Sequence, residues 1–237
     1  MKINVDVLEF IAMSDKGKTL VGKKIAELVQ NGQIIGVGTG STVAAALDAI
    51  SERVKKDKLN VSFVPTSYQS TWQLEQLGLQ SLDFAGDWKI DWGFDGADAV
   101  DSVGNIVKGK GAAMLREKIL AANCPKYYIL VDDSKLCENI LGHVRVPVEV
   151  HPASTVSVST SLKRLSAKSV EIRMAEKKHG PVITEAGNVI LDANFQSFRP
   201  ELEDEIKQIV GVVESGLFIG YADQIYVARG EQIEELL

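Results

Sequence analysis

Residues 33–47 read QIIGVGTGSTVAAAL. An apolar stretch runs into a loop containing Gly36, Gly38 and Gly40, and an alanine-rich segment follows. This order predicts a buried strand, a glycine turn and an α-helix that begins at the turn. The unpaired N–H groups and positive potential of a helix N-terminus favour an anion, and glycine permits its close approach. We therefore expect an α/β fold with a phosphate-binding loop; a turn whose glycines serve only packing is the alternative.

The two best-known nucleotide loops do not fit this stretch. A P-loop requires lysine after its last glycine, whereas Ser41 and Thr42 follow Gly40 here. A dinucleotide-binding loop requires G-x-G-x-x-G and an acidic residue at the end of the next strand, whereas this loop is G-x-G-x-G and the next strand ends VPTS at 64–67. The loop is thus expected to present the hydroxyls of Thr39, Ser41 and Thr42 to a small phosphate group.

The order of segments predicts two domains. The first part of the chain alternates helix-like and strand-like stretches, which is typical of a parallel sheet with crossover helices. Later segments follow a β-α-β-β-α order. We predict an α/β fold: a Rossmann-like, mostly parallel sheet domain at 1–143 plus 217–237, and a smaller α+β, ferredoxin-like domain at 144–216. The tail at 222–236 is expected to return a strand and a helix to the larger domain.

Composition excludes several classes of protein. The chain has 237 residues, a formal net charge of -6 and a pI near 5.2, which argues against nucleic-acid binding. Its apolar runs are too short to span a membrane, and the N-terminal 18 residues contain no clear cleavage site for a secretion signal. Two cysteines and three dispersed histidines give neither a disulfide framework nor a metal-binding pattern. We expect a cytoplasmic protein with no metal, no cofactor and no nucleic-acid or membrane partner.

An acidic loop follows the third expected parallel strand, in GFDGADAVD at 93–101. Ligands of open α/β proteins bind at the carboxyl ends of the strands. Small residues separate Asp95 from Asp98, so both carboxylates can reach one cleft, whereas Asp101 is typical of a solvated turn. Lys108, ten residues beyond Asp98, supplies a cation that can balance the aspartates.

A second glycine loop, KGKG at 108–111, opens the helix-like stretch AAMLREKIL at 112–120. Glu117 lies one turn beyond Ala113 and one turn before Leu120. If these two residues mark the inner face of the helix, Glu117 lies near the edge that looks toward the sheet. Spacing alone leaves the alternative of an exposed helical glutamate open.

Four motifs in this order resemble type A ribose-5-phosphate isomerases. They are GVGTGST at 36–42, FDGAD at 94–98, KGKGAAMLREKIL at 108–120 and VDDSK at 131–135. The stretches GNVILD and GVVESGLF fit the same family, so the resemblance covers nearly the whole chain. The resemblance implies a two-domain enzyme of the non-oxidative pentose phosphate pathway that interconverts ribose 5-phosphate and ribulose 5-phosphate without a metal. It also implies a homodimer or homotetramer.

The resemblance also implies roles for single residues. It assigns catalysis to Glu117 as the base and to Asp95, Asp98 and Lys108. It assigns binding of the sugar phosphate to Lys18, Thr39, Gly40, Ser41, Thr42, Asp95, Gly96, Ala97, Asp98, Lys108, Gly109, Lys110, Gly111 and Lys135. One carboxylate can carry a proton between neighbouring carbons through a cis-enediol(ate), while an ammonium and loop N–H groups stabilise the charge on oxygen. The phosphate would supply remote binding energy, and one aspartate can assist opening of the furanose ring.

Several positions depart from the family pattern. Lys110 stands at the usual third glycine, Ala99 follows D-G-A-D where an acid is common, the turn at 184–188 is TEAGN, and Ser215 replaces an asparagine. None of these changes removes a catalytic side chain. Lys110 either alters affinity or substrate preference, or points to solvent.

Three other functions compete with this interpretation. A non-catalytic sugar-phosphate sensor is disfavoured because the acid, lysine and base positions are intact and no DNA-binding domain is evident. An isomerase acting on a different sugar phosphate is compatible with the departures at Lys110 and Ala99. A nucleotide-binding oxidoreductase is disfavoured by the spacing of the first glycine loop.

Overall fold

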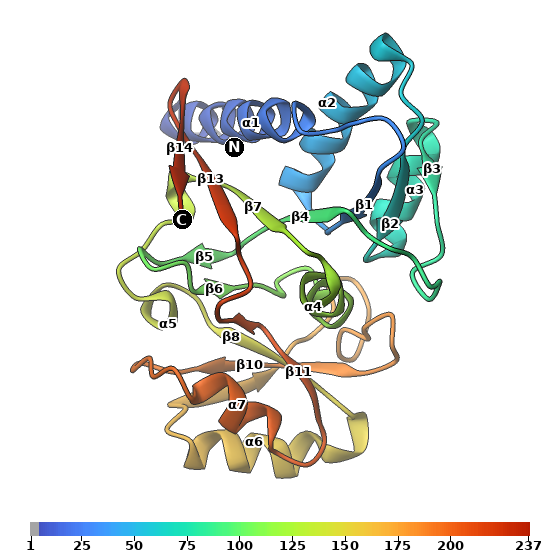
Figure 1. Ribbon diagram of the computed structural model, residues 1–237. Coiled ribbons are helices and arrows are strands. Elements are labelled where there is room, and N and C mark those ends of the chain that lie inside the picture. Colours follow the sequence, from blue (N-terminus) through green and yellow to red (C-terminus); the bar gives the residue numbers. More distant parts are fainter. Residues whose placement is uncertain (1–4) are drawn as a thin grey trace. The chain divides into compact units, whose positions relative to one another are not determined.

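The computed structural model describes the backbone of residues 5–237 and the side chains of residues 15–237. The chain forms two compact units (Figure 1). The first comprises Met1–Gly96, Leu120–Lys135 and Ala222–Leu237, and the second comprises Ala97–Ile119 and Leu136–Tyr221. Of the N-terminal 18 residues, in which we expect no secretion signal, residues 1–4 and the side chains of residues 5–14 lie outside the described part. No helix of the described part is long and apolar enough to cross a bilayer.

The first unit is built on a seven-stranded sheet of order β14-β13-β7-β4-β1-β2-β3. Its strands are β1 (Ile34–Val37), β2 (Ser62–Pro65), β3 (Gln80–Ser81), β4 (Trp92–Gly96), β7 (Tyr127–Asp132), β13 (Gln224–Arg229) and β14 (Gln232–Leu236). All neighbours pair in parallel except β13 and β14. The predicted Rossmann-like, mostly parallel sheet is therefore confirmed. Its order places the carboxyl ends of β7, β4, β1 and β2 side by side along one edge.

Helices cover this sheet and complete its core. They are α1 (Val5–Ala26), α2 (Ser41–Asp57), α3 (Tyr68–Gln76) and the end of α4 (Met114–Asn123), with the short 3₁₀ helix η1 (Asp133–Lys135) after β7. The apolar spacing at 16–32 predicts a helix that ends at Gly32. Val21 and Ile25 of α1 are fully buried, as this spacing predicts, but α1 ends at Ala26. On the other side of β1, a Cβ at Gly36 would lie 2.4 Å from a methyl carbon of Leu120, so the helix packs on bare backbone.

The second unit contains a four-stranded antiparallel sheet of order β11-β8-β10-β9. Its elements are β8 (Val146–Val150), η2 (Pro152–Ser154), α6 (Thr155–Arg164), β9 (Ser169–Ile172), β10 (Val189–Asn194), α7 (Leu202–Lys207) and β11 (Val212–Ser215). This β-α-β-β-α-β succession and strand order are those of a ferredoxin-like unit, as predicted. The stretch GPVITEAGNVILDANF at 180–195 predicts a strand on each side of the TEAGN turn. Before the turn, the described structure has isolated bridges instead, Met174 with Pro181 and Ile183 with Val189.

A three-stranded sheet of order β12-β6-β5 also belongs to the second unit. Its strands are β5 (Ala99–Val100), β6 (Ile106–Val107) and β12 (Leu217–Phe218), and α5 (Ile140–His143) lies nearby in the chain. Ala99, Val107 and Ile140 share a buried apolar cluster with Val146 and Val148 of β8. This packing explains why residues 97–119 and 136–143 group with the second unit, whereas the sequence pattern placed them in the first.

The C-terminal tail is a hairpin, not a strand followed by a helix. Arg229 pairs with Gln232 across a two-residue loop, and Gly230 adopts a φ of 58° there. Two-residue hairpin loops require such positive φ values, which glycine adopts without strain. Ile233 of β14 packs on the core of the first unit. The prediction of a helix at EQIEELL is therefore wrong.

Candidate active site

The loop between β1 and α2 leaves the helix N-terminus open. Gly40 stands at the N-cap with a φ of 125°, a conformation that a residue with a Cβ rarely adopts. No side chain among the described residues caps α2. Ser41 is exposed and Thr42 is half-buried. The N–H groups of the first turn and these two hydroxyls are thus left for an anion.

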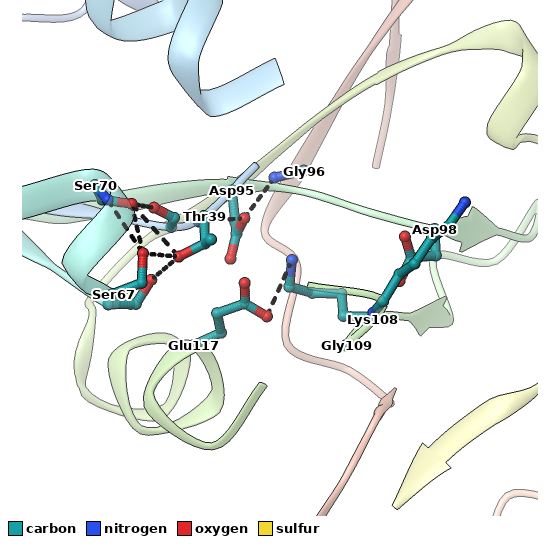
Figure 2. A network of polar contacts seen from close by, with 12 residues as sticks. Thr39, Ser67, Ser70, Asp95, Gly96, Asp98, Lys108, Gly109 and Glu117 are labelled. Atoms are coloured by element: carbon teal, nitrogen blue, oxygen red, sulfur yellow. Dashed lines mark hydrogen bonds and ion pairs between the residues drawn. The ribbon is translucent and has the colours of Figure 1, made fainter. Parts of the chain in front are cut away.

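A cluster of hydroxyl groups binds the loop between β1 and α2 (Figure 2). The Oγ1 of Thr39 lies 2.9 Å from Thr66 Oγ1 and donates to Ser67 Oγ at 2.7 Å. Ser67 caps α3, and Ser70 donates to the Gly38 carbonyl. The Thr39 hydroxyl is therefore engaged inside the first unit, where it ties the loop after β1 to the loop after β2.

Asp95, at the end of β4, is fully buried and accepts hydrogen bonds from its own unit. Its Oδ1 accepts the Gly96 N–H at 2.7 Å and the Thr39 N–H at 3.2 Å. Its Oδ2 accepts the Tyr127 hydroxyl at 3.0 Å. A Cβ at Gly38 would lie 2.0 Å from the Asp95 Cγ, so only glycine lets the carboxylate approach the loop this closely. Asp95 thus holds the anion loop in place.

Two lysines extend from the same unit. Lys18 of α1 is mostly buried and lies 3.3 Å from the exposed Asp15 carboxylate. Its neighbour Gly17 packs closely on β7, since a Cβ there would lie 3.4 Å from the Asp132 Cβ at the carboxyl end of that strand. Lys135 follows β7 in η1 and is half-buried. The backbone of both lysines therefore lies near the carboxyl end of β7.

In the second unit, Lys108 and Glu117 form a buried ion pair (Figure 2). The Lys108 Nζ lies 3.4 Å from Glu117 Oε2, and 4% and 5% of the two side chains are exposed. The Lys108 N–H donates to the Gly216 carbonyl at 2.8 Å, and its Nζ lies 5.9 Å from the centre of the Phe218 ring. Glu117 is therefore not the exposed helical glutamate that its spacing alone allowed.

The loop that begins with Lys108 is connected to the acidic loop. The Asp98 N–H donates to the Val107 carbonyl at 2.9 Å, and Asp98 Oδ2 accepts the Lys110 N–H at 2.9 Å. Gly109 has a φ of 103°, and a Cβ there would lie 2.7 Å from the Met114 sulfur. Glycine is thus required at this turn, and Asp98 faces a backbone donor rather than an ammonium.

A second buried ion cluster lies directly after Glu117. Lys118 Nζ donates to Glu203 Oε1, to Glu214 Oε1 at 2.9 Å and to the Leu217 carbonyl at 2.6 Å. It also lies 4.7 Å from the centre of the Phe218 ring. This cluster joins the first turns of α4 to α7 and to the β11–β12 segment, and it fixes the part of the helix that carries Glu117.

Comparison with known proteins shows which family the chain belongs to. A profile of the ribose 5-phosphate isomerase A (phosphoriboisomerase A) family matches residues 62–232. The ribose-5-phosphate isomerase A of Thermosynechococcus vestitus is 41% identical over 215 residues, covering 90% of this chain and 91% of that protein. The human ribose-5-phosphate isomerase is 38% identical over 221 residues, covering 91% of this chain and 71% of that protein. The chain belongs to the ribose 5-phosphate isomerase A family.

Solved structures of this family have the same fold. The enzyme from Methanocaldococcus jannaschii superposes with a TM-score of 0.90 at 33% identity, covering 94% of this chain and 99% of that one. A D-ribose-5-phosphate isomerase in complex with phospho-erythronic acid also gives 0.90, at 32% identity and with 94% and 98% coverage. The expected mixed α/β architecture is that of ribose 5-phosphate isomerases.

Two departures from the family pattern can be located in the second unit. Ala99 is fully buried in β5, where it pairs with Val107. Lys110 is exposed and lines a cavity of about 530 Å³ that Asp98 and Arg173 also line. Lys110 is therefore a solvent-exposed residue at the rim of the loop, and its backbone N–H donates to Asp98.

The predicted site residues form two groups, one in each unit. The first unit holds Lys18, Thr39, Gly40, Ser41, Thr42, Asp95, Gly96 and Lys135. The second holds Ala97, Asp98, Lys108, Gly109, Lys110, Gly111 and Glu117. Asp101 is part of a turn, as expected, but it is buried rather than solvated, because its carboxylate accepts the N–H groups of Val103 and Asn105.

Sequence reasoning missed the residues that support these groups. In the first unit they are Thr66, Ser67, Ser70 and Tyr127, and in the second they are Lys118, Arg173, Asp192, Glu203 and Glu214. Two signals were available: a serine three residues before Ser70 is typical of a helix N-cap, and a tyrosine in a buried strand requires a partner for its hydroxyl. Among the described residues, no group of three or more His, Cys, Asp or Glu side chains is arranged to hold a metal ion.

Proposed function

We propose that this chain interconverts D-ribose 5-phosphate and D-ribulose 5-phosphate, with Glu117 as the base that moves the proton. The observation that supports this proposal is the buried pair of Lys108 and Glu117 at 3.4 Å. A base must be ionised before it can accept a proton, and a nearby ammonium stabilises the ionised carboxylate. Burial excludes water, which would otherwise weaken this interaction.

The reaction begins when the Glu117 carboxylate takes the proton from C2 of the open-chain aldose. The electron pair of the C–H bond forms the C1–C2 double bond, and negative charge develops on the C1 oxygen. The Lys108 ammonium stabilises that charge, together with loop N–H groups. A proton then passes from the C2 oxygen to the C1 oxygen, and Glu117 returns its proton to C1. The product is the 2-ketose, and atoms and electrons balance without a redox partner.

The phosphate group of the substrate supplies binding energy at a distance from the reacting carbons. The open N-terminus of α2, the hydroxyls of Ser41 and Thr42, and the ammonium groups of Lys18 and Lys135 are the groups suited to hold it. Binding energy from this remote group orients the reacting carbons. Loss of Lys18 is therefore expected to raise KM more than it lowers kcat.

The two aspartates have different parts in this proposal. Asp95 is fully buried and accepts three donors of its own unit, so its main part is to hold the loop at Thr39. Asp98 is half-buried and its Oδ2 accepts the backbone N–H of Lys110, so the carboxylate has capacity left for a sugar hydroxyl. Asp98 is the better candidate to assist ring opening. The homodimer or homotetramer, and the cytoplasmic location, stay predictions.

The test is an isomerase assay with purified protein. Formation of ketose is followed with ribose 5-phosphate, with arabinose 5-phosphate, with a six-carbon aldose phosphate and with unphosphorylated ribose. The proposal predicts the highest kcat/KM with ribose 5-phosphate and a large loss without the phosphate. Faster turnover of another aldose phosphate would assign a different substrate, and tight binding of ribose 5-phosphate without any turnover would indicate a sensor.

A further inference from the structure

Arg173, the first residue after β9, binds one carboxylate and two backbone carbonyls in the second unit. Its Nε donates to Asp192 Oδ2 at 2.9 Å, and its Nη2 donates to Asp192 Oδ1. Its Nη1 donates to the carbonyl of Gly109 at 2.8 Å and to the carbonyl of Lys110 at 3.0 Å. A carboxylate on strand β10 thus holds the guanidinium against two consecutive carbonyls of the 108–111 loop.

The direction of these two carbonyls determines where the loop N–H groups point. In a trans peptide, the C=O and the N–H point in opposite directions. The Gly109 carbonyl shares a peptide with the Lys110 N–H, and the Lys110 carbonyl shares one with the Gly111 N–H. Since both carbonyls are turned to Arg173, both N–H groups are turned away from it.

The two N–H groups have different surroundings. That of Lys110 donates to Asp98 Oδ2 at 2.9 Å. That of Gly111 belongs to an exposed residue, and a Cβ placed there would meet no atom within 4 Å. The Asp98 carboxylate already takes the Lys110 N–H, so of these two groups the Gly111 N–H is the one left to meet a negatively charged oxygen. In this loop, the Lys110 N–H is therefore bound to Asp98, and the Gly111 N–H is open to a ligand.

We propose that Arg173 is a positioning residue for the isomerase reaction, an inference that rests on the proposed function. Arg173 orients the peptides of the 108–111 loop so that the Gly111 N–H faces the substrate oxygen that becomes negatively charged. The same loop begins with Lys108, whose ammonium pairs with Glu117. Loss of Arg173 would free the Lys110 carbonyl, so the peptide that carries the Gly111 N–H could rotate, whereas the Gly109 carbonyl would still accept the Ala112 N–H at 3.0 Å. Arg173 thus acts through the loop and not by touching the substrate.

This loop needs an external anchor. Gly109 has a φ of 103° and Ala112 a φ of 60°, so the turn occupies the left-handed region twice within four residues. Glycine-rich backbone loses much conformational freedom when it is held in one state. The planar guanidinium of Arg173 has five donors, enough to bind a carboxylate in bidentate fashion and two carbonyls together. Lysine has one nitrogen and cannot reproduce both contacts.

The test compares Arg173→Gln, Arg173→Lys and Asp192→Asn with the control Arg145→Gln. Arg145 lines the same cavity and also pairs with a carboxylate, that of Glu171 at 2.6 Å, but this pair does not involve the 108–111 loop. For each protein, kcat, KM, inhibition by phospho-erythronic acid and the urea midpoint of unfolding are measured. Removal of one aligned donor for a developing oxyanion costs on the order of 100-fold in rate, which sets the scale for Arg173→Gln.

We expect Arg173→Gln to lower kcat roughly 10- to 100-fold and KM to change by less than about 3-fold, because the phosphate site is untouched. Phospho-erythronic acid, whose carboxylate resembles the charged intermediate, should bind more weakly by a similar factor. Arg173→Lys and Asp192→Asn should fall between this variant and wild type, while Arg145→Gln should match wild type.

Three results would overturn the inference, and the one that also ends the proposed function is distinguishable from the other two. If wild type is active and Arg173→Gln retains the kcat and inhibitor affinity of Arg145→Gln, Arg173 does not position the loop. A fall in kcat that only follows a lower unfolding midpoint, with inhibitor affinity intact, leads to the same conclusion. If wild type itself fails to isomerise ribose 5-phosphate, the proposed function fails and the role of Arg173 in it fails too.

Discussion

Lys108 Nζ lies 3.4 Å from Glu117 Oε2, with both side chains almost completely buried in the second unit. A buried ion pair is a weak source of stability, because removing two charges from water costs about as much as their attraction returns. A surface pair would have been less costly to maintain. The arrangement is explained by chemistry instead: a dry carboxylate next to an ammonium is suited to move a proton while charge develops on a neighbouring oxygen.

Lys108→Met tests the energetic side of this pair. The variant leaves the buried Glu117 carboxylate without this ammonium, and breaking one side of a buried pair costs about 3 to 5 kcal/mol in unfolding free energy. The double variant Lys108→Met/Glu117→Gln should recover much of that loss, because no charge is left behind. Urea unfolding measures both. Lys110→Met, an exposed lysine in the same loop, is the stability control. Equal midpoints for the single and double variants would show that the two charges are not coupled.

Gly38→Ala tests the contact between the anion loop and Asp95. The added methyl would lie 2.0 Å from the Asp95 Cγ, so the loop or the carboxylate must move. Overpacking of this kind costs about 1 to 3 kcal/mol, and the shift should raise KM for the sugar phosphate. Gly142→Ala is the matched control, because its nearest side-chain atom lies at an ordinary 3.5 Å. A Gly38→Ala protein with wild-type KM and midpoint would show that the loop tolerates the methyl.

Cys124 makes stability depend on alkaline pH. Burial raises the pKa of this thiol from 9.0 to about 12, and the Asp223 carboxylate adds to the rise. Between pH 9 and pH 12 the thiol of the unfolded chain has lost its proton, while the thiol of the folded chain keeps it. The contribution of Cys124 to the free energy of unfolding is therefore complete below pH 9 and is lost as the pH rises toward 12. Unfolding free energy measured against pH should therefore fall less steeply in Cys124→Ala than in wild type.

The same burial predicts the reactivity of the thiol. The thiolate is the reactive form, so Cys124 should resist iodoacetamide at neutral pH until the chain unfolds. Mass spectrometry of the alkylated protein, with and without denaturant, measures this. Rapid modification of Cys124 in the folded protein, or identical pH slopes for the two proteins, would contradict the assignment.

Much of the site could be predicted because the local pattern and the chemistry agree. The strand, glycine turn and helix around Gly40 follow from residues close in sequence, and so does the order of strands that brings Asp95 to the sheet edge. The buried state of Glu117 was one of two open alternatives. The periodicity of α4 allowed it, but the contacts that decide it come from Lys108 nine residues earlier and from segments far along the chain.

The features that could not be predicted depend on tertiary pairing. Arg173 lies more than 60 residues from the loop it binds, and its partner Asp192 is on another strand. Residues 97–119 join the second unit because β6 pairs with β12 near the end of the chain. The tail forms strand β14 because it pairs with β13, whereas a helix this short is only marginally stable without tertiary contacts.

Glu117→Gln in deuterated water tests the central claim most directly. Wild type should introduce solvent deuterium into the sugar phosphate at the carbon that the base protonates, and the variant should do so at least about 100-fold more slowly, the scale of general base catalysis. Its affinity for phospho-erythronic acid should stay close to that of wild type, because the phosphate groups are unchanged. Exchange by Glu117→Gln at the wild-type rate would contradict the account.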